Sequence, residues 1–384
     1  MPFPLFDART ASRIRVLIVD DSAVMRSLLR SVISSDPSLE IAGTALNGET
    51  ALDAIQDLRP DMVLLDVEMP VMDGLVTLRN LRERGHRMPV IMCSSLTQRG
   101  ARVTIEALAA GASDYVAKPA GQTSPAAAAS ALAQELLPKI HALMPAMPLR
   151  GLSPDLQSTL SLPTPPNRFE TALSAPSIVV IGVSTGGPAA LDILLPSLPA
   201  DFPLPVLVVQ HMPELFTGLL AERLAGYCPL KVREAAEGDV VRPGHIFIAR
   251  GDWHLEVLAA AHVGQPPTLH LTQREPENHC RPSVDVLFRS ASAAYGAGVL
   301  AVVLTGMGSD GLAGSRAVRT RGGLVLAQDD ATSAVWGMPG AVTRAGLTNH
   351  VLPIQAISGE IVRLTTGPLA PADEAGALRE WKAS

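Results

Sequence analysis

Acidic residues follow apolar runs in the N-terminal third of the chain. Asp20 and Asp21 follow the first run, and Asp66 ends a later one, while Ser94 and Lys118 end two more. If these runs are parallel strands, the polar residues meet at one edge of a sheet, and three carboxylates there require a cation such as Mg²⁺. The residue types predict a phosphoryl-acceptor site, with Asp66 as nucleophile, Lys118 offsetting charge and Ser94 donating a hydrogen bond to a phosphoryl oxygen.

A serine in the C-terminal half has the surroundings of a nucleophile. The segment GVSTG at 182–186 fits G-x-S-x-G, follows an apolar run and precedes a helical pattern. Small neighbours let the backbone turn sharply and present the hydroxyl of Ser184 at a helix N-terminus. Such a turn could equally bind phosphate, so the motif alone leaves both interpretations open.

A serine nucleophile needs a base and a group that orients the base. Of the nine histidines, His211 directly follows the apolar run 204–210, at the sheet edge expected for Ser184. Asp310, in the glycine-rich turn 305–311, can orient His211, and the backbone amide of Met307 is a candidate oxyanion donor. The chain order Ser, His, Asp differs from the orders of α/β-hydrolases, chymotrypsin and subtilisin, so the protein is not simply one of those enzymes.

Alternating apolar runs and helical patterns would position these residues. In the first third, runs near 16–20, 39–45, 61–66, 89–95 and 113–119 alternate with amphipathic segments. Five such units predict an α/β fold with a doubly wound parallel sheet, and the flavodoxin-like strand order 2-1-3-4-5 would make strands 1 and 3 neighbours.

The second half predicts another α/β domain after a break. Seven prolines between 145 and 176 indicate an extended linker. From residue 177 apolar strands and helical patterns alternate again, which predicts a second doubly wound α/β domain. Segments 242–252 and 254–260 resemble the strands of a hairpin, so an antiparallel region is expected as well.

Composition limits the class of protein. At about 150 residues per domain, 384 residues indicate two domains plus connecting chain, and a net charge of −6 gives no general reason to bind nucleic acid. Cys93, Cys228 and Cys280 form no C-x-x-C pair, which fits a reducing compartment. No apolar run reaches the ~20 residues of a membrane helix. We therefore expect a cytoplasmic protein without membrane insertion.

The N-terminal motifs resemble those of a known domain family. VDDS, LLDVEMPVMDG, CSS and YVAKP are similar to the receiver domain of two-component response regulators, over about 14–140. The resemblance implies phosphorylation at Asp66 and Mg²⁺ held by Asp21, Asp66 and the backbone carbonyl of Glu68, with Asp20 acting directly or through water. It also implies that Tyr115 is an aromatic switch residue.

The C-terminal motifs resemble a second family. IGVSTGGPAAL, VVQHMPELFTGLLAERL, RPSVDVLF, LTGMGSDGLAG and GMPGAV are similar to the catalytic domain of the chemotaxis protein-glutamate methylesterase/glutaminase, over about 177–365. The resemblance implies Ser184 as nucleophile, His211 as base and Asp310 as its partner. Thr185 and Met307 would lie near the oxyanion. Gly340-Ala341 stand where the family usually has a charged residue followed by Glu, which alters the charge of that loop near the site.

Together the resemblances imply a domain division and a function. The expected parts are a receiver at 14–140, a linker at 141–176, a catalytic domain at 177–365 and a tail at 366–384. The function implied is phosphorylation-activated hydrolysis of glutamate γ-methyl esters on chemoreceptors, together with deamidation of receptor glutamines. The phosphodonor would be a chemotaxis histidine kinase, and the esterase site would need no cofactor. We expect the unphosphorylated receiver to cover the Ser184 site. The alternatives are a non-catalytic binding module and, without a recognition-helix pattern in its favour, a nucleic-acid-binding output.

Overall fold

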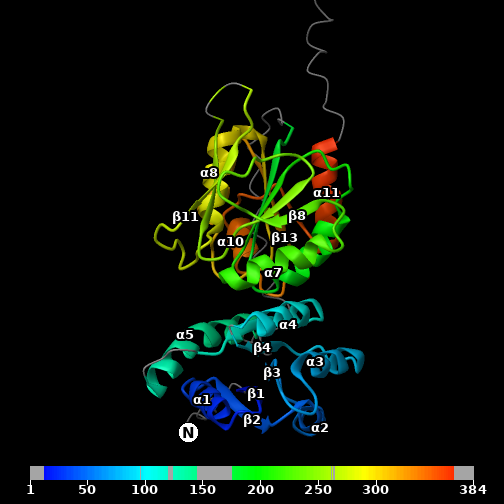
Figure 1. Ribbon diagram of the computed structural model, residues 1–384, viewed down its shortest axis with the longest axis vertical. Coiled ribbons are helices and arrows are strands. Elements are labelled where there is room, and N and C mark those ends of the chain that lie inside the picture. The colour runs from blue at the N-terminus through cyan, green and yellow to red at the C-terminus, as the bar shows by residue number, and fades with distance from the viewer. Residues whose placement is uncertain are drawn as a thin grey trace, which may run out of the picture.

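Two parallel sheets organise the chain, which we describe from a computed structural model (Figure 1). The structure describes residues 13–366 except 96, 120–123, 145–174, 261 and 263. Most of the predicted linker and tail therefore lies outside the described residues. No helix among those described combines the length and apolar character of a membrane span.

The N-terminal sheet has five parallel strands in the order β2-β1-β3-β4-β5, which confirms the predicted topology. The strands are β1 (Ile14–Val19), β2 (Leu39–Ala45), β3 (Met62–Asp66), β4 (Val90–Ser94) and β5 (Asp114–Ala117). The helices are α1 (Ala23–Ser34), α2 (Gly48–Leu58), α3 (Gly74–Glu83), α4 (Gln98–Ala109) and α5 (Pro125–Leu143). Helix α5 runs three residues beyond the predicted domain boundary at 140.

The C-terminal sheet has seven parallel strands in the order β14-β13-β12-β6-β7-β9-β8. They are β6 (Ile178–Val183), β7 (Val206–Gln210), β8 (Lys231–Glu234), β9 (His245–Ile248), β12 (Val299–Val303), β13 (Leu324–Gln328) and β14 (His350–Leu352). The chain leaves β6 toward β7 and later returns to β12 on the other side of β6. This makes the β6/β12 boundary a topological switch point, where open α/β sheets bind ligands.

The antiparallel region is present, but its partners differ from those expected. Segment 242–252 contains β9, which joins the parallel sheet between β7 and β8. The other segment contains β10 (His254–Leu258), which pairs with β11 (Thr268–Thr272). The prediction that these two neighbouring segments pair with each other was wrong, because a short apolar run does not indicate which strand it will pair with.

Helices cover both faces of the second sheet. They are α6 (Gly187–Leu194), α7 (Glu214–Ala225), α8 (Val284–Tyr295), α9 (Leu312–Thr320), α10 (Met338–Arg344) and α11 (Ile354–Thr366). One apolar cluster contains α8 and α9 residues, whereas another combines α6, α7 and α11 residues with Ile105 and Leu108 of α4. Figure 1 shows α4 beneath α7, so the two halves share a continuous apolar layer.

Candidate functional site

The acidic residues of the first sheet converge as predicted from their positions in the sequence. The Nζ atom of Lys118 lies 2.8 Å from Oδ2 of Asp20 and 2.7 Å from Oδ1 of Asp66. Carboxylate oxygens of Asp20, Asp21 and Asp66 lie within 4.8 Å of one another. Burial raises the pKa of Asp66 to about 6, with the Lys118 hydrogen bond acting in the opposite direction. These hard oxygen donors fit Mg²⁺.

Other residues of the predicted phosphorylation site have different partners here. Ser94 Oγ donates to the carbonyl of Ser95 and accepts a 2.7 Å hydrogen bond from Thr104 Oγ1. Its hydroxyl therefore already has hydrogen-bond partners next to the carboxylate pocket. The side chain of Glu68 pairs with exposed Arg99 at 3.4 Å, and the backbone carbonyl of Glu68 remains the predicted metal ligand.

Tyr115 lies between the two halves of the chain. Its buried ring stacks on Phe216 of α7, with ring centroids 4.7 Å apart. Lys139 Nζ donates a 2.6 Å hydrogen bond to the Tyr115 carbonyl. The predicted switch residue is therefore part of an interdomain contact.

The Ser184 turn is held by its neighbours in the sheet. The Ser184 amide donates to the carbonyl of Thr305 at 3.0 Å, and Gln210 Nε2 donates to the Ser184 carbonyl at 3.0 Å. Gly186 precedes α6 as its N-terminal capping residue with φ at +76°, and a Cβ there would lie 2.5 Å from Ala334 Cβ. The turn thus requires glycine at that position.

His211 and Asp310 form a hydrogen-bonded pair, with Nε2 of His211 2.8 Å from Oδ2 of Asp310. Asp310 is almost fully buried at the N-terminus of α8, where it accepts hydrogen bonds from the amides of Val284 and Asp285 and from Ser283 Oγ. Burial alone would raise the pKa of Asp310, but His211 and these amides outweigh it and hold the pKa at about 2. Asp310 is therefore ionised at neutral pH.

The second ring nitrogen of His211 faces Cys280, with Nδ1 3.6 Å from the sulfur atom. Burial lowers the pKa of His211, but the hydrogen bonds with Asp310 and Cys280 outweigh that effect and raise the pKa to about 9. Ser184 lines the same cavity. Among the residues described, Ser184 Oγ forms no hydrogen bond with His211. The structure thus brings together two of the three predicted catalytic side chains, with the third beside them.

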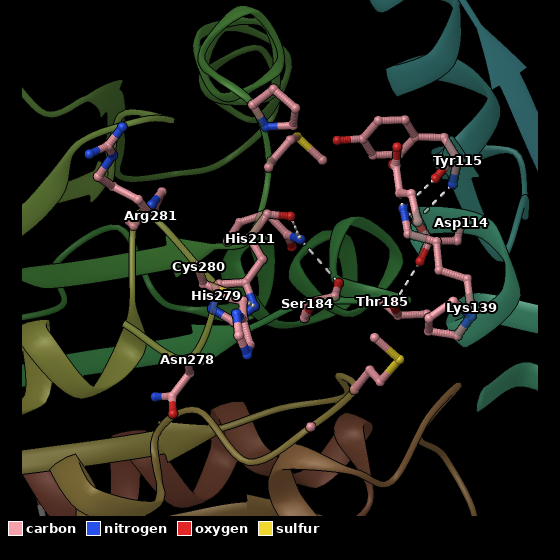
Figure 2. Close-up of a pocket in the computed structure, with 18 of the residues that line it drawn as sticks. Asp114, Tyr115, Lys139, Ser184, Thr185, His211, Asn278, His279, Cys280 and Arg281 are labelled. Carbon is pink, nitrogen blue, oxygen red and sulfur yellow. Dashed lines mark hydrogen bonds and ion pairs between the residues drawn. The ribbon is translucent and has the colours of Figure 1, made fainter. Parts of the chain in front are cut away.

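A cavity of about 740 Å³ contains this cluster and is lined from both halves of the chain. Figure 2 shows Asp114 and Lys139 on one side of it and Cys280 on the other, with Ser184 and Thr185 between them. Thr185 Oγ1 donates a 2.6 Å hydrogen bond to Oδ2 of buried Asp114. The N-terminal half therefore contacts the residue next to the predicted nucleophile.

Sequence reasoning missed several members of this site: Asp114, Gln210, Asn278 and Cys280. Gln210 ends β7 beside His211 and is 2% exposed. The sequence held a signal for Gln210, because it is a polar residue at the end of an apolar strand and stands next to the predicted base. The others come from distant segments, and no spacing along the chain connects them to Ser184.

The fold and these two clusters define a class of protein in which an α/β domain with a carboxylate pocket covers an α/β domain with a Ser, His and Asp constellation. The response regulator receiver domain family matches residues 16–129, and the CheB methylesterase family matches residues 179–361. A protein-glutamate methylesterase/protein-glutamine glutaminase of a Nocardioides species is 49% identical, over 95% of this chain and 99% of its own length. One from Trichodesmium erythraeum is 44% identical, over 91% and 99%. The chain belongs to the protein-glutamate methylesterase/protein-glutamine glutaminase family.

A solved structure is also similar. The CheB methylesterase catalytic domain of Thermotoga maritima is 43% identical and covers 50% of this chain and all of its own, with a TM-score of 0.48.

Proposed function

We propose that the protein is a serine hydrolase that removes methyl groups from glutamate γ-methyl esters of chemoreceptors and converts certain receptor glutamines to glutamate. The observation that carries this proposal is the His211–Asp310 hydrogen bond beside Ser184, at the carboxyl ends of neighbouring strands in one cavity. Membership of the family favours this function over a non-catalytic binding module.

Ser184 Oγ attacks the side-chain carbonyl carbon of the substrate, and His211 accepts the hydroxyl proton. Asp310 accepts a hydrogen bond from Nε2 of His211, so Nδ1 is the nitrogen left for this proton. Collapse of the tetrahedral intermediate expels methanol, or ammonia from a glutamine, with the proton returned by His211. Water then hydrolyses the glutamyl-enzyme by the same proton transfers.

The backbone amides of Thr185 and Met307 are the proposed oxyanion donors. Both residues line the cavity, and neither amide is paired with an acceptor within the part of the chain that the structure describes. Free amides next to Ser184 and in the Asp310 turn can stabilise negative charge that develops on the carbonyl oxygen.

Phosphorylation at Asp66 controls the hydrolase in this proposal. Asp20, Asp21, Asp66 and the Glu68 carbonyl would hold Mg²⁺, which neutralises the charge of the incoming phosphoryl group. Lys118 already pairs with two of these carboxylates. A chemotaxis histidine kinase is the proposed phosphodonor, with Ser94 as the phosphoryl hydrogen-bond donor and Tyr115 as the switch.

The receiver restrains the esterase site in the unphosphorylated protein. Its Asp114 side chain binds Thr185, and Tyr115 stacks on Phe216 at the edge of the same cavity. Substrate access requires these contacts to separate. The proposed division is a receiver at 14–140, a linker at 141–176, a catalytic domain at 177–365 and a tail at 366–384, in a protein that acts in the cytoplasm.

Methanol release from methyl-labelled receptor membranes tests the proposal. The wild type should release methanol faster when a small-molecule phosphodonor and Mg²⁺ are added, Asp66→Asn should lose this response, and Ser184→Ala should release none. Full activity of Ser184→Ala would refute the nucleophile assignment. Release that is equal with and without phosphodonor would refute the control mechanism.

A further inference from the structure

The thiol of Cys280 and the imidazole of His211 are arranged like two ligands of one metal ion. Their Sγ and Nδ1 atoms are 3.6 Å apart, although the residues are 69 positions apart in the chain. Tetrahedral Zn²⁺ has bonds of about 2.3 Å to sulfur and about 2.1 Å to nitrogen, which places the two ligand atoms about 3.6 Å apart. The observed spacing therefore equals the separation expected for two ligands of one tetrahedral ion.

The surroundings of the pair also fit a metal ligand. A histidine that binds a metal through one nitrogen commonly donates its other ring N–H to a carboxylate, which fixes the orientation of the ring. Asp310 accepts this hydrogen bond at 2.8 Å from Nε2, which leaves Nδ1 directed toward Cys280.

The loop that carries Cys280 is held in place before any ligand arrives. Asn278 and His279 both have positive φ values, 54° and 62°, which are costly for residues other than glycine. The side-chain amide of Asn278 donates to Asp285 at 3.0 Å and to Asp310 at 2.9 Å. The acidic partner of the imidazole thus also anchors the loop that presents the thiol.

We propose that Cys280 and His211 form an inhibitory site for a thiolate-binding divalent metal, with Zn²⁺ as the representative ion. The inhibitory effect rests on the proposed function, because the metal would occupy Nδ1, the nitrogen that must accept the Ser184 proton. When the metal binds at neutral pH, the Cys280 thiol proton and the Nδ1 proton of the protonated His211 ring are both released to solvent. His279 also lines this cavity and would be the nearest candidate for a further ligand from the same loop.

This site differs in chemistry from the carboxylate pocket of the receiver. Asp20, Asp21 and Asp66 offer oxygen atoms only, which favour Mg²⁺, whereas a thiolate and an imidazole favour Zn²⁺ or Co²⁺. A metal bound at Cys280 therefore has a spectroscopic signature that the receiver pocket cannot produce.

Titration of the full chain with Co²⁺, after treatment with EDTA, tests binding without reference to activity. The wild type should develop a thiolate-to-cobalt charge-transfer absorption that saturates near one metal per chain. Cys280→Ser should lose the absorption. Two matched controls should keep the absorption. Cys228→Ser removes a half-buried thiol outside the site, and Cys93→Ser removes a fully buried thiol in β4. No absorption in the wild type, or unchanged absorption in Cys280→Ser, would overturn the site.

Methanol release tests the inhibitory effect. Zn²⁺ should slow the wild type, EDTA should restore it, and Cys280→Ser should need about tenfold more Zn²⁺ for the same fractional loss of its own metal-free rate. Equal sensitivity of the two proteins would refute inhibition through Cys280. Cobalt binding together with no methanol release in EDTA would instead refute the proposed function and leave the metal site standing.

Discussion

Asp114 of the receiver accepts a 2.6 Å hydrogen bond from the hydroxyl of Thr185, the residue that follows Ser184. Both side chains are almost fully buried, so little water competes for the bond. Loss of a buried hydrogen bond to a charged group costs roughly 1.5–3 kcal/mol. In the proposed function this contact is one that must break before substrate reaches the esterase site.

Substitution of Asp114 should release part of that restraint. We expect Asp114→Ala to raise methanol release without phosphodonor by about tenfold. The exposed residue Asp57 on α2 supplies the matched control, since Asp57→Ala removes the same group away from the interface. A basal rate unchanged in Asp114→Ala would mean that this hydrogen bond does not restrain the enzyme.

The aromatic contact should lower the basal esterase rate more than the ion pair in the same interface does. Tyr115 stacks on Phe216 in a buried setting, whereas Arg102 and Glu222 are 3.4 Å apart with both side chains more than 60% exposed. We expect Tyr115→Ala to raise the basal rate and shrink the phosphodonor response, and Arg102→Ala to change the basal rate less than about fivefold. Basal rates ranked in the opposite order would contradict the assignment of Tyr115 to the restraint.

The pH dependence of the esterase should follow His211. Its raised pKa of about 9 means that the imidazole is protonated at neutral pH, so kcat/KM should rise as pH increases toward 9 and the proton leaves. Asp310→Asn removes the charge that raises this pKa, so the midpoint should move to lower pH. The plateau rate should also fall by roughly 10⁴, because the ring loses the partner that fixes its tautomer. A pH-rate profile of both proteins checks this, and an unmoved midpoint would exclude His211 as the titrating base.

Lys118 should stabilise the receiver in the absence of metal. Its single positive charge pairs with both Asp20 and Asp66, whose side chains are 0% and 3% exposed. Lys118→Ala in EDTA should lower the free energy of unfolding by about 3–5 kcal/mol, since two buried carboxylates lose their counter-charge. Thermal unfolding should show a larger rise with Mg²⁺ in this variant than in the wild type. Lys231→Ala, at an exposed position of β8, is the control. Equal Mg²⁺ effects would indicate that the ion does not bind beside these carboxylates.

Residues at strand ends could be placed from the sequence, because hydrophobic runs fix where a buried strand stops. Asp20, Asp66 and Lys118 were expected at one sheet edge, and they lie within ion-pair distance. His211 and Asp310 were expected to pair, and they share a hydrogen bond. Asp20, Asp66, Lys118 and His211 stand at or directly after the ends of their strands, and parallel strands bring their carboxyl ends to one edge. Asp310 lies in the turn after β12, so its position could be placed only at the same edge and not at a strand end.

Contacts between distant segments could not be predicted from the positions of strand ends. Asp114 begins β5 and has no local pattern that indicates a partner on the second sheet, yet it binds Thr185. Cys280 meets His211 because Asn278 anchors an irregular loop, and irregular loops carry no periodicity. The strand β9 was assigned to a hairpin since its sequence does not distinguish an internal parallel strand from a hairpin arm.

In the proposed activation, the apolar layer that the two halves share makes release of the receiver sensitive to temperature. Separating α4 from α7 would expose Ile105, Leu108 and Phe216 to water, and exposure of apolar surface carries a positive heat-capacity change. Hydrophobic contact strengthens on warming from low temperature. The population of the form with α4 packed on α7 therefore increases relative to the separated form as the temperature rises through that range. At equal phosphorylation the activated fraction should then be larger in the cold, which links the adaptation rate of a cell to its temperature through packing alone.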